Sequence, residues 1–350
     1  MKVGLIGFPG SGVTTVFSLF CQRDYEQLAY SGKNEVHLGE TKIPDIRVEK
    51  LAEYFDSRKT VHITIEFADI PFEKHPGEAL ASSTIGHIRN MDAIVLVVRA
   101  FSNPAVPHIS GGLDPVRDIN SFLHEALLSD LIQVEKKIEK LVKEGRIKSR
   151  EGQLFMGLKQ GLEQSIPVRN MQLDSDAVKE LSGFRLLTEK PWLVIVNTDP
   201  GDGISAELME TMQIHGLSGM PIAAKFELEL ESFSDVERLE FLHDIGLMEG
   251  AAKRFIDMVY SRLDLISFLT TGSDETRAWS IHRGGTALEA AGKIHTDMAR
   301  GFIRAEVFHF DDLVQHGGNL AAVKKSGKFR VEGKNYTVQD GDIITILFNV

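Results

Sequence analysis

Apolar residues recur along this chain with two different periods, which divide it into predicted strands and helices. Five segments have the continuous or alternating apolar pattern of strands: residues 3–6, 60–68, 93–98, 192–196 and 220–224. The continuous runs are typical of strands buried on both faces of a parallel sheet. Segments with helical spacing separate the strands, beginning at 16–20. The pattern therefore predicts a mostly parallel α/β sheet with its ligand chemistry at the carboxyl ends of the strands.

A long helical insertion is predicted between the third and fourth of these strands. Its apolar residues are spaced alternately four and three apart, as in a coiled-coil seam: Leu127, Leu131, Val134, Ile138 and Leu141. A polar break at 145–152 precedes leucines at 154, 158 and 162, and the second helix must end before Pro167. We expect an antiparallel helical hairpin.

From Leu265 onward, short strands flank one helix. The predicted strands are 266–269, 278–281, 302–310, 328–338 and 342–348, and the helix is 286–294. This composition is typical of a small α+β domain. His295, Thr296 and Asp297 resemble catalytic residues, but no nucleophile is patterned beside them, so a turn at the helix end is the better interpretation.

Composition narrows the class of protein. The chain has 350 residues, a net charge of −11 and one cysteine, Cys21, so an intrachain disulfide and a cysteine zinc cluster are excluded. The net charge argues against non-specific nucleic-acid binding by the whole surface, but it leaves room for a local basic patch. We expect a cytoplasmic protein without a signal segment or a membrane span, and with neither membrane nor DNA among its partners.

A glycine-rich segment, residues 7–15, joins the first predicted strand to the first predicted helix. It fits the phosphate-binding P-loop pattern G-x-x-x-x-G-K-[ST], except that Val13 stands at the lysine position. The residues expected to cradle phosphate are Gly7, Pro9, Gly10, Ser11, Gly12, Val13, Thr14 and Thr15. The alternative is a glycine turn that merely joins strand to helix.

A metal site is predicted beside this loop. The hydroxyl of Thr14 is suited to Mg²⁺, and Asp69 follows the alternating strand at its carboxyl end. Asp69 could instead be a turn cap.

The predicted tip of the hairpin is basic. Seven cations stand there against Glu139 and Glu144: Lys136, Lys137, Lys140, Lys143, Arg146, Lys148 and Arg150. Lys140, Lys143, Arg146 and Lys148 are candidate contacts to RNA or another partner. A solvated charged face is the alternative.

Several longer motifs resemble the YchF-type proteins of the Obg-related P-loop GTPases. They include Ile43-Pro44-Asp45, Arg277-Ala278-Trp279, the stretch from Ala290 to Asp297, the stretch from Arg300 to Glu306, and Val338-Gln339-Asp340-Gly341-Asp342. The resemblance covers nearly the whole chain. It implies a P-loop NTPase domain (1–120 and 190–264), an inserted coiled-coil hairpin (121–189) and a ubiquitin-like β-grasp TGS domain (265–350). It also implies Mg²⁺ with ATP or GTP, and association with ribosomes or RNA.

The departures from the family pattern all fall in the nucleotide site. Besides Val13, Lys33 stands where the family has a phosphate-sensing threonine, and Phe72 replaces the glycine of Asp-x-x-Gly. The base-recognition motif keeps Asn197 and Thr198, but its carboxylate is out of register. Asp199 or Asp202 could substitute for that carboxylate, and Lys33 or Lys74 could replace the lysine.

These losses predict a protein that binds a purine nucleotide weakly, hydrolyses it little and has no catalytic residue that we can name. Phosphoryl transfer depends on positioning and charge stabilisation, and losing one electrostatic donor typically costs about a hundredfold or more. Two alternatives remain open. One is a working ATPase or GTPase with a substitute cation, and the other is a nucleotide-free scaffold.

Overall fold

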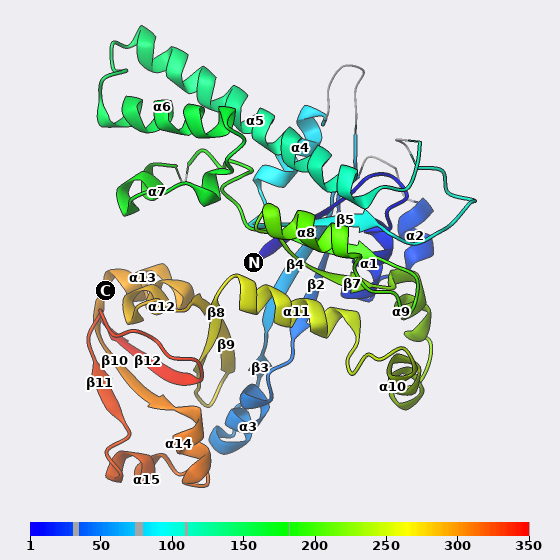
Figure 1. Ribbon diagram of the computed structural model, residues 1–350. Coiled ribbons are helices and arrows are strands. Elements are labelled where there is room, and N and C mark those ends of the chain that lie inside the picture. The colour runs from blue at the N-terminus through cyan, green and yellow to red at the C-terminus, as the bar shows by residue number, and fades with distance from the viewer. Residues whose placement is uncertain (31–34, 74–79, 109–110, 182, 350) are drawn as a thin grey trace. The chain divides into compact units, whose positions relative to one another are not determined.

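The computed structural model describes residues 1–30, 35–73, 80–108, 111–181 and 183–349 (Figure 1). The chain forms two compact units. Unit 1 comprises residues 1–41 and 66–252, and unit 2 comprises 42–65 and 253–350. This division places residues 42–65 in the same unit as the C-terminal segment. The three domains proposed from the sequence, with their boundaries, stay a prediction.

Unit 1 is built on a six-stranded sheet in the order β2-β4-β1-β5-β6-β7. The strands are β1 (Lys2–Ile6), β2 (His37–Ile43), β4 (Ile63–Asp69), β5 (Ala93–Arg99), β6 (Trp192–Asn197) and β7 (Ser218–Ile222). β1 is parallel to both of its neighbours, with Val3 opposite Phe67 on one side and Ala93 on the other. The strand order therefore reverses between β1 and β5, which is the point where open α/β sheets bind their ligands.

Unit 1 also contains helices. They are α1 (Val13–Cys21), α2 (Tyr25–Tyr30), α4 (Ser82–Arg89), α5 (Pro115–Lys143), α6 (Arg150–Glu163), η1 (Val168–Asn170), α7 (Ser175–Leu181), α8 (Ala206–Ile214), α9 (Ala224–Leu230) and α10 (Asp235–Asp244). α4, α5 and α8 share one core cluster with the sheet, through residues such as Ile88, Phe122 and Met212.

α5 and α6 form the predicted hairpin and run alongside each other in Figure 1. α5 begins where Asp114 accepts a hydrogen bond from the Arg117 amide and Pro115 occupies the first turn. Val134 and Leu141 of the predicted seam are fully buried against Phe155 and Leu158 of α6. The apolar spacing of the sequence thus located both helices correctly.

Unit 2 contains a mixed sheet in the order β11-β10-β12-β8-β9-β3. Its strands are β3 (Thr60–Val61), β8 (Leu265–Thr270), β9 (Thr276–His282), β10 (Phe302–His309), β11 (Arg330–Glu332) and β12 (Asp342–Phe348). Its helices are α3 (Ile46–Phe55), α12 (Ala287–Ile294), α13 (Thr296–Arg300), α14 (Phe310–Gln315), α15 (Leu320–Lys325) and most of α11 (Ala251–Arg262). Thr286 begins α12 with a capping box to Glu289.

Most predicted elements are present, and the clearest differences are the following. The predicted strand 60–68 is divided at His62, because Thr60 and Val61 pair with β9 while Ile63–Asp69 forms β4. Only residues 330–332 of the predicted strand 328–338 are a strand, and α14 and α15 were not foreseen. His295 caps α12 and α13, as the helix-end interpretation expects. Among the described residues, no helix is long and apolar enough to cross a membrane.

Candidate functional site

The loop between β1 and α1 has the backbone conformation of a phosphate cradle. Gly10 and Gly12 have φ angles of 83° and 95°, a region that side chains with a Cβ rarely adopt. Gly12 is the N-cap of α1, so the first amides of the helix are aimed at the loop without a capping side chain. The glycine pattern predicted this geometry.

Two close approaches explain why this loop needs glycine. A Cβ on Gly7 would lie 2.4 Å from the Val97 carbonyl oxygen, and a Cβ on Gly12 would lie 2.3 Å from the Asn197 amide nitrogen. A Cβ on Gly7 would also lie 3.0 Å from Val13 Cγ2. Val13, which stands at the lysine position, thus lies over the loop with an apolar side chain.

The Thr14 hydroxyl and the Asp69 carboxylate meet beside the loop. Thr14 Oγ1 donates a hydrogen bond of 2.8 Å to Asp69 Oδ2, and His37 Nδ1 lies 3.6 Å from the same oxygen. Burial raises the pKa of Asp69, and the hydrogen bond from Thr14 together with the nearby His37 offsets part of that effect. The sequence analysis missed His37, which lies on β2.

Mg²⁺ and a nucleotide phosphate fit this arrangement. Thr14 and Asp69 provide hard oxygen donors, which Mg²⁺ prefers, and phosphate and water complete its coordination in nucleotide sites. The Ser11 hydroxyl is buried and has no hydrogen-bond partner among the described residues, as expected for a donor whose acceptor is on a ligand. Thr14 and Asp69 would hold the metal, and the loop amides would face the phosphates.

Asn197 connects three segments at the end of β6. Its Nδ2 donates to the Ser11 carbonyl at 2.9 Å, and its Oδ1 accepts from the Ala224 amide at 3.2 Å. The side chain is 5% exposed, so these bonds are shielded from water. Asn197 therefore holds the β1–α1 loop against the start of α9.

A small pocket of 160 Å³ lies next to Asn197. It is lined in part by Thr198, Asp202, Ala223 and Glu227. Its volume is below the roughly 300 Å³ at which pockets for whole ligands begin, so it suits part of a ligand, such as a base. Of the two candidate carboxylates, Asp202 lines this pocket, whereas Asp199 accepts from the Ser102 amide at 3.1 Å.

An aromatic cluster is formed by Phe8, which belongs to the loop, and two neighbouring rings. The ring centroid of Phe8 lies 5.1 Å from that of Phe72 and 4.7 Å from that of Phe122. Phe72, at the position of the family's glycine, is thus packed against the loop. The two candidate replacement cations, Lys33 and Lys74, lie outside the described residues.

Two polar side chains near the loop were missed from the sequence. Arg99 ends β5, is 4% exposed and donates to carbonyls at 101, 103 and 106; its Nη1 lies 3.9 Å from the position of a Cβ on Gly10. His108 Nε2 lies 2.9 Å from Asp118 Oδ2, and its ring packs edge-on against Phe8. The only sequence signal for Arg99 is a charge that ends a fully apolar run.

The hairpin tip carries less unbalanced charge than its sequence indicates. Glu151 pairs with Lys137 at 2.5 Å and Arg146 at 2.7 Å, and Arg150 pairs with Asp174 at 3.0 Å. The sequence analysis had compared the seven cations of the tip with Glu139 and Glu144 only. Among the candidate contacts, Lys140 lies 3.9 Å from Glu144. Lys143 and Lys148 have no ion pair with any described residue.

The chain is similar to known proteins over its whole length. A family model described as "YchF-GTPase_C: Protein of unknown function (DUF933)" matches residues 265–349. The chain is 35% identical to "Ribosome-binding ATPase YchF" of Bacillus subtilis (strain 168), over 100% of both chains. It is 33% identical to the protein of that name from Escherichia coli O157:H7, over 100% of this chain and 99% of the relative.

A solved structure shares the fold. "Structure of the Schizosaccharomyces pombe YchF GTPase" superimposes with a TM-score of 0.83 at 27% identity, covering 99% of this chain and 97% of that one. The predicted α/β fold class is confirmed by this match.

Proposed function

Because this chain belongs to the YchF family, we propose that it is a cytosolic protein that binds a purine nucleotide with Mg²⁺ and associates with the ribosome, while hydrolysing little nucleotide. The observation that carries the proposal is a phosphate cradle with its metal donors in contact, Thr14 and Asp69, but with Val13 in place of the lysine. The relatives' names supply the ribosome as partner.

The nucleotide is held mainly by backbone and hydroxyl groups. The amides at the N-terminus of α1 and the Ser11 hydroxyl would donate to phosphate, because helix N-termini carry partial positive charge. When bound, Mg²⁺ supplies charge neutralisation at the phosphates, and Thr14 and Asp69 would hold it. Asn197 keeps the loop in register, while Thr198 and Asp202 would face the base.

Hydrolysis is expected to be weak because two groups that face the γ-phosphate are replaced. The side chain of Val13 cannot donate a hydrogen bond, and the ring of Phe72 is packed against that of Phe8. Phosphoryl transfer depends on electrostatic stabilisation, and each lost donor typically costs about a hundredfold or more.

Calorimetry with ADP, ATP, GDP and GTP in the presence of Mg²⁺ tests nucleotide binding. We expect Thr14→Ala to weaken binding strongly, since it removes a proposed metal ligand. Thr345→Ala is the matched control, because Thr345 is an exposed threonine of β12 and lies outside the β1–α1 loop. Absence of heat at millimolar concentrations of all four nucleotides would refute the nucleotide half of the proposal.

Co-sedimentation with ribosomes tests the second half. Lys143→Glu and Lys148→Glu should each weaken binding and flatten its salt dependence, because a phosphate contact releases counterions. Lys225→Glu is the control: this lysine on α9 is also exposed but lies outside the tip. If the tip variants sediment like the control, the tip is only a solvated face.

A functional ATPase or GTPase is the second candidate. It is favoured by the charge of Arg99 beside Gly10 and by His37 beside Asp69. Turnover that is lost in both Thr14→Ala and Asp69→Ala would support it. Turnover that survives both substitutions would come from a contaminating enzyme.

A further inference from the structure

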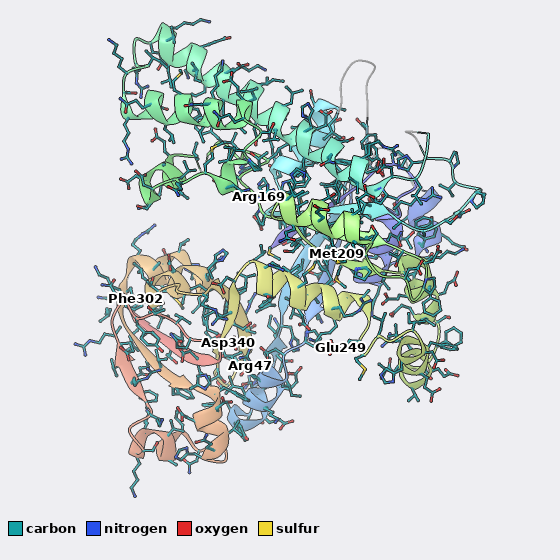
Figure 2. The ribbon with its side chains drawn as sticks, in the orientation of Figure 1. Arg47, Arg169, Met209, Glu249, Phe302 and Asp340 are labelled. Atoms are coloured by element: carbon teal, nitrogen blue, oxygen red, sulfur yellow. The ribbon has the colours of Figure 1, made fainter. Side chains whose placement is uncertain are left out.

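Unit 1 contains a second pocket, which the nucleotide site does not use. Its volume is 780 Å³, within the range of roughly 300–1,000 Å³ that small-molecule sites occupy. It lies where the start of α5, the chain between α6 and α7, and α8 border one another, and its wall includes Arg169, Asn120 and His215. Figure 2 labels Arg169 on the segment that follows α6.

Arg169 is a half-buried cation without a carboxylate partner among the described residues. Its Nη1 donates to the Thr188 carbonyl at 3.4 Å, while its Nη2 is shielded from water and has no acceptor. Burial lowers the pKa of Arg169, and no neighbouring carboxylate opposes that effect. A guanidinium remains charged even so. A buried charge without a partner is costly, so an incoming anion would relieve that cost.

One buried carboxylate bonds to the same residue as Arg169, Thr188, but it is already used by the backbone. Asp130 accepts from the amides of Leu187 and Thr188 at 2.8 and 2.7 Å, and also from the Thr188 hydroxyl. In contrast, Arg117 on the same pocket wall pairs with Asp118 at 3.2 Å. Of the two arginines among the described residues that line this pocket, Arg169 is therefore the one whose charge is available to a ligand.

Two neighbours of Arg169 add hydrogen-bonding capacity. Burial and the charge of Arg169 both lower the pKa of His215, so its imidazole is neutral at neutral pH. His215 Nε2 lies 2.8 Å from Asn120 Oδ1, which assigns the ring proton to Nε2. That assignment leaves the Asn120 amide nitrogen as a donor toward the pocket.

We propose that this pocket binds a phosphate monoester, with its phosphate group at Arg169 and Asn120. Glu125 and Glu207 also line the pocket and would accept from hydroxyl groups on the remainder of the ligand. A planar guanidinium binds phosphate oxygens in pairs, which favours phosphate over an isolated halide. The proposal does not depend on nucleotide binding at the β1–α1 loop.

Calorimetric titration of the full chain with inorganic phosphate and with ribose 5-phosphate, at constant ionic strength, tests it. We expect ribose 5-phosphate to bind more tightly than inorganic phosphate. Arg169→Met should weaken both by about tenfold or more, since it removes the charge and keeps the length. Arg185→Met is the control, because this arginine is exposed and bonds to Asn90 outside the pocket. Any phosphate that binds at the β1–α1 loop contributes equally in the wild type and both variants, so it does not affect the comparison between them.

A second variant keeps the test decisive if Arg169→Met fails to fold. Asn120 is exposed, and Asn120→Asp adds a carboxylate to the pocket at almost unchanged shape. We expect it to weaken phosphate binding as strongly as Arg169→Met, because the new charge repels the ligand and pairs with Arg169. Equal affinity in the wild type and Asn120→Asp would overturn the proposal, as would ribose 5-phosphate binding no more tightly than inorganic phosphate.

Discussion

Restoring the missing lysine is the sharpest test of the nucleotide site. Val13 occupies the first position of α1, and its side chain lies over Gly7. In Val13→Lys, the longer side chain starts from this place and can reach a bound phosphate. Hydrogen bonds to charged groups contribute about 1.5–3 kcal/mol. We therefore expect nucleotide affinity to rise by roughly tenfold to 150-fold, since about 1.4 kcal/mol corresponds to a factor of ten.

The same substitution should destabilise the free protein slightly. A cation at a helix N-terminus opposes the helix dipole, at a cost of about 0.3–1 kcal/mol. The free energy of unfolding without nucleotide should fall by this amount, and bound phosphate should reverse the loss. Urea titration of Val13→Lys with and without ADP and Mg²⁺ measures both effects.

Val13→Met is the matched control, because it gives a long side chain without charge. Calorimetry should show tighter ADP binding for Val13→Lys than for Val13→Met. Equal affinities would mean that position 13 does not face a phosphate, and the proposed cradle would then be wrong. Turnover should stay low in Val13→Lys, because Phe72 is unchanged, and should rise further in the double variant with Phe72→Gly.

Three further substitutions test the geometry that supports the site. Gly12→Ala should lower the free energy of unfolding by about 2–4 kcal/mol in urea titration, because its Cβ would strike Asn197 and the left-handed conformation is strained. Asp69→Asn should abolish the effect of Mg²⁺ on nucleotide affinity yet raise stability at pH 7. Burial raises the pKa of Asp69, so ionisation of Asp69 weakens the fold as pH rises through that pKa. The advantage of Asn should vanish below about pH 4, where the carboxyl group is protonated in both the folded and the unfolded state. Asp130→Ala should lower the free energy of unfolding by about 3 kcal/mol, because it leaves two buried amides and the Thr188 hydroxyl without an acceptor, and thermal denaturation measures the loss.

The sequence predicted the elements of the fold better than their partners. Apolar periodicity located β1, β5 and β6, because strands buried on both faces leave continuous apolar runs. It could not show that Thr60 and Val61 pair with β9, more than 200 residues later in the chain. Strand pairing at such separation leaves no local periodic signal.

The candidate site was predicted where backbone sterics dictate the residue type. Gly7 and Gly12 leave no room for a Cβ, so a glycine pattern identified the loop. His37 and Arg99 were missed because their roles depend on what the fold brings beside them. The charge of the hairpin tip was misjudged for a related reason, since the Lys137–Glu151 and Arg150–Asp174 pairs form only after folding.

We infer that the residues that shape the loop are separable from the residues that would face a γ-phosphate. Gly12 and Asn197 fix the loop by contact and hydrogen bonding, and neither needs a nucleotide for this. Val13 and Phe72 replace groups whose role in the family resemblance is toward phosphate, and both are apolar here. We therefore propose that replacing the second set lowers charge stabilisation while the loop, held by the first set, keeps its shape. Nucleotide binding is therefore expected to respond to changes at Gly12, Val13 and Thr14, whereas turnover is expected to rise only when positions 13 and 72 are changed together.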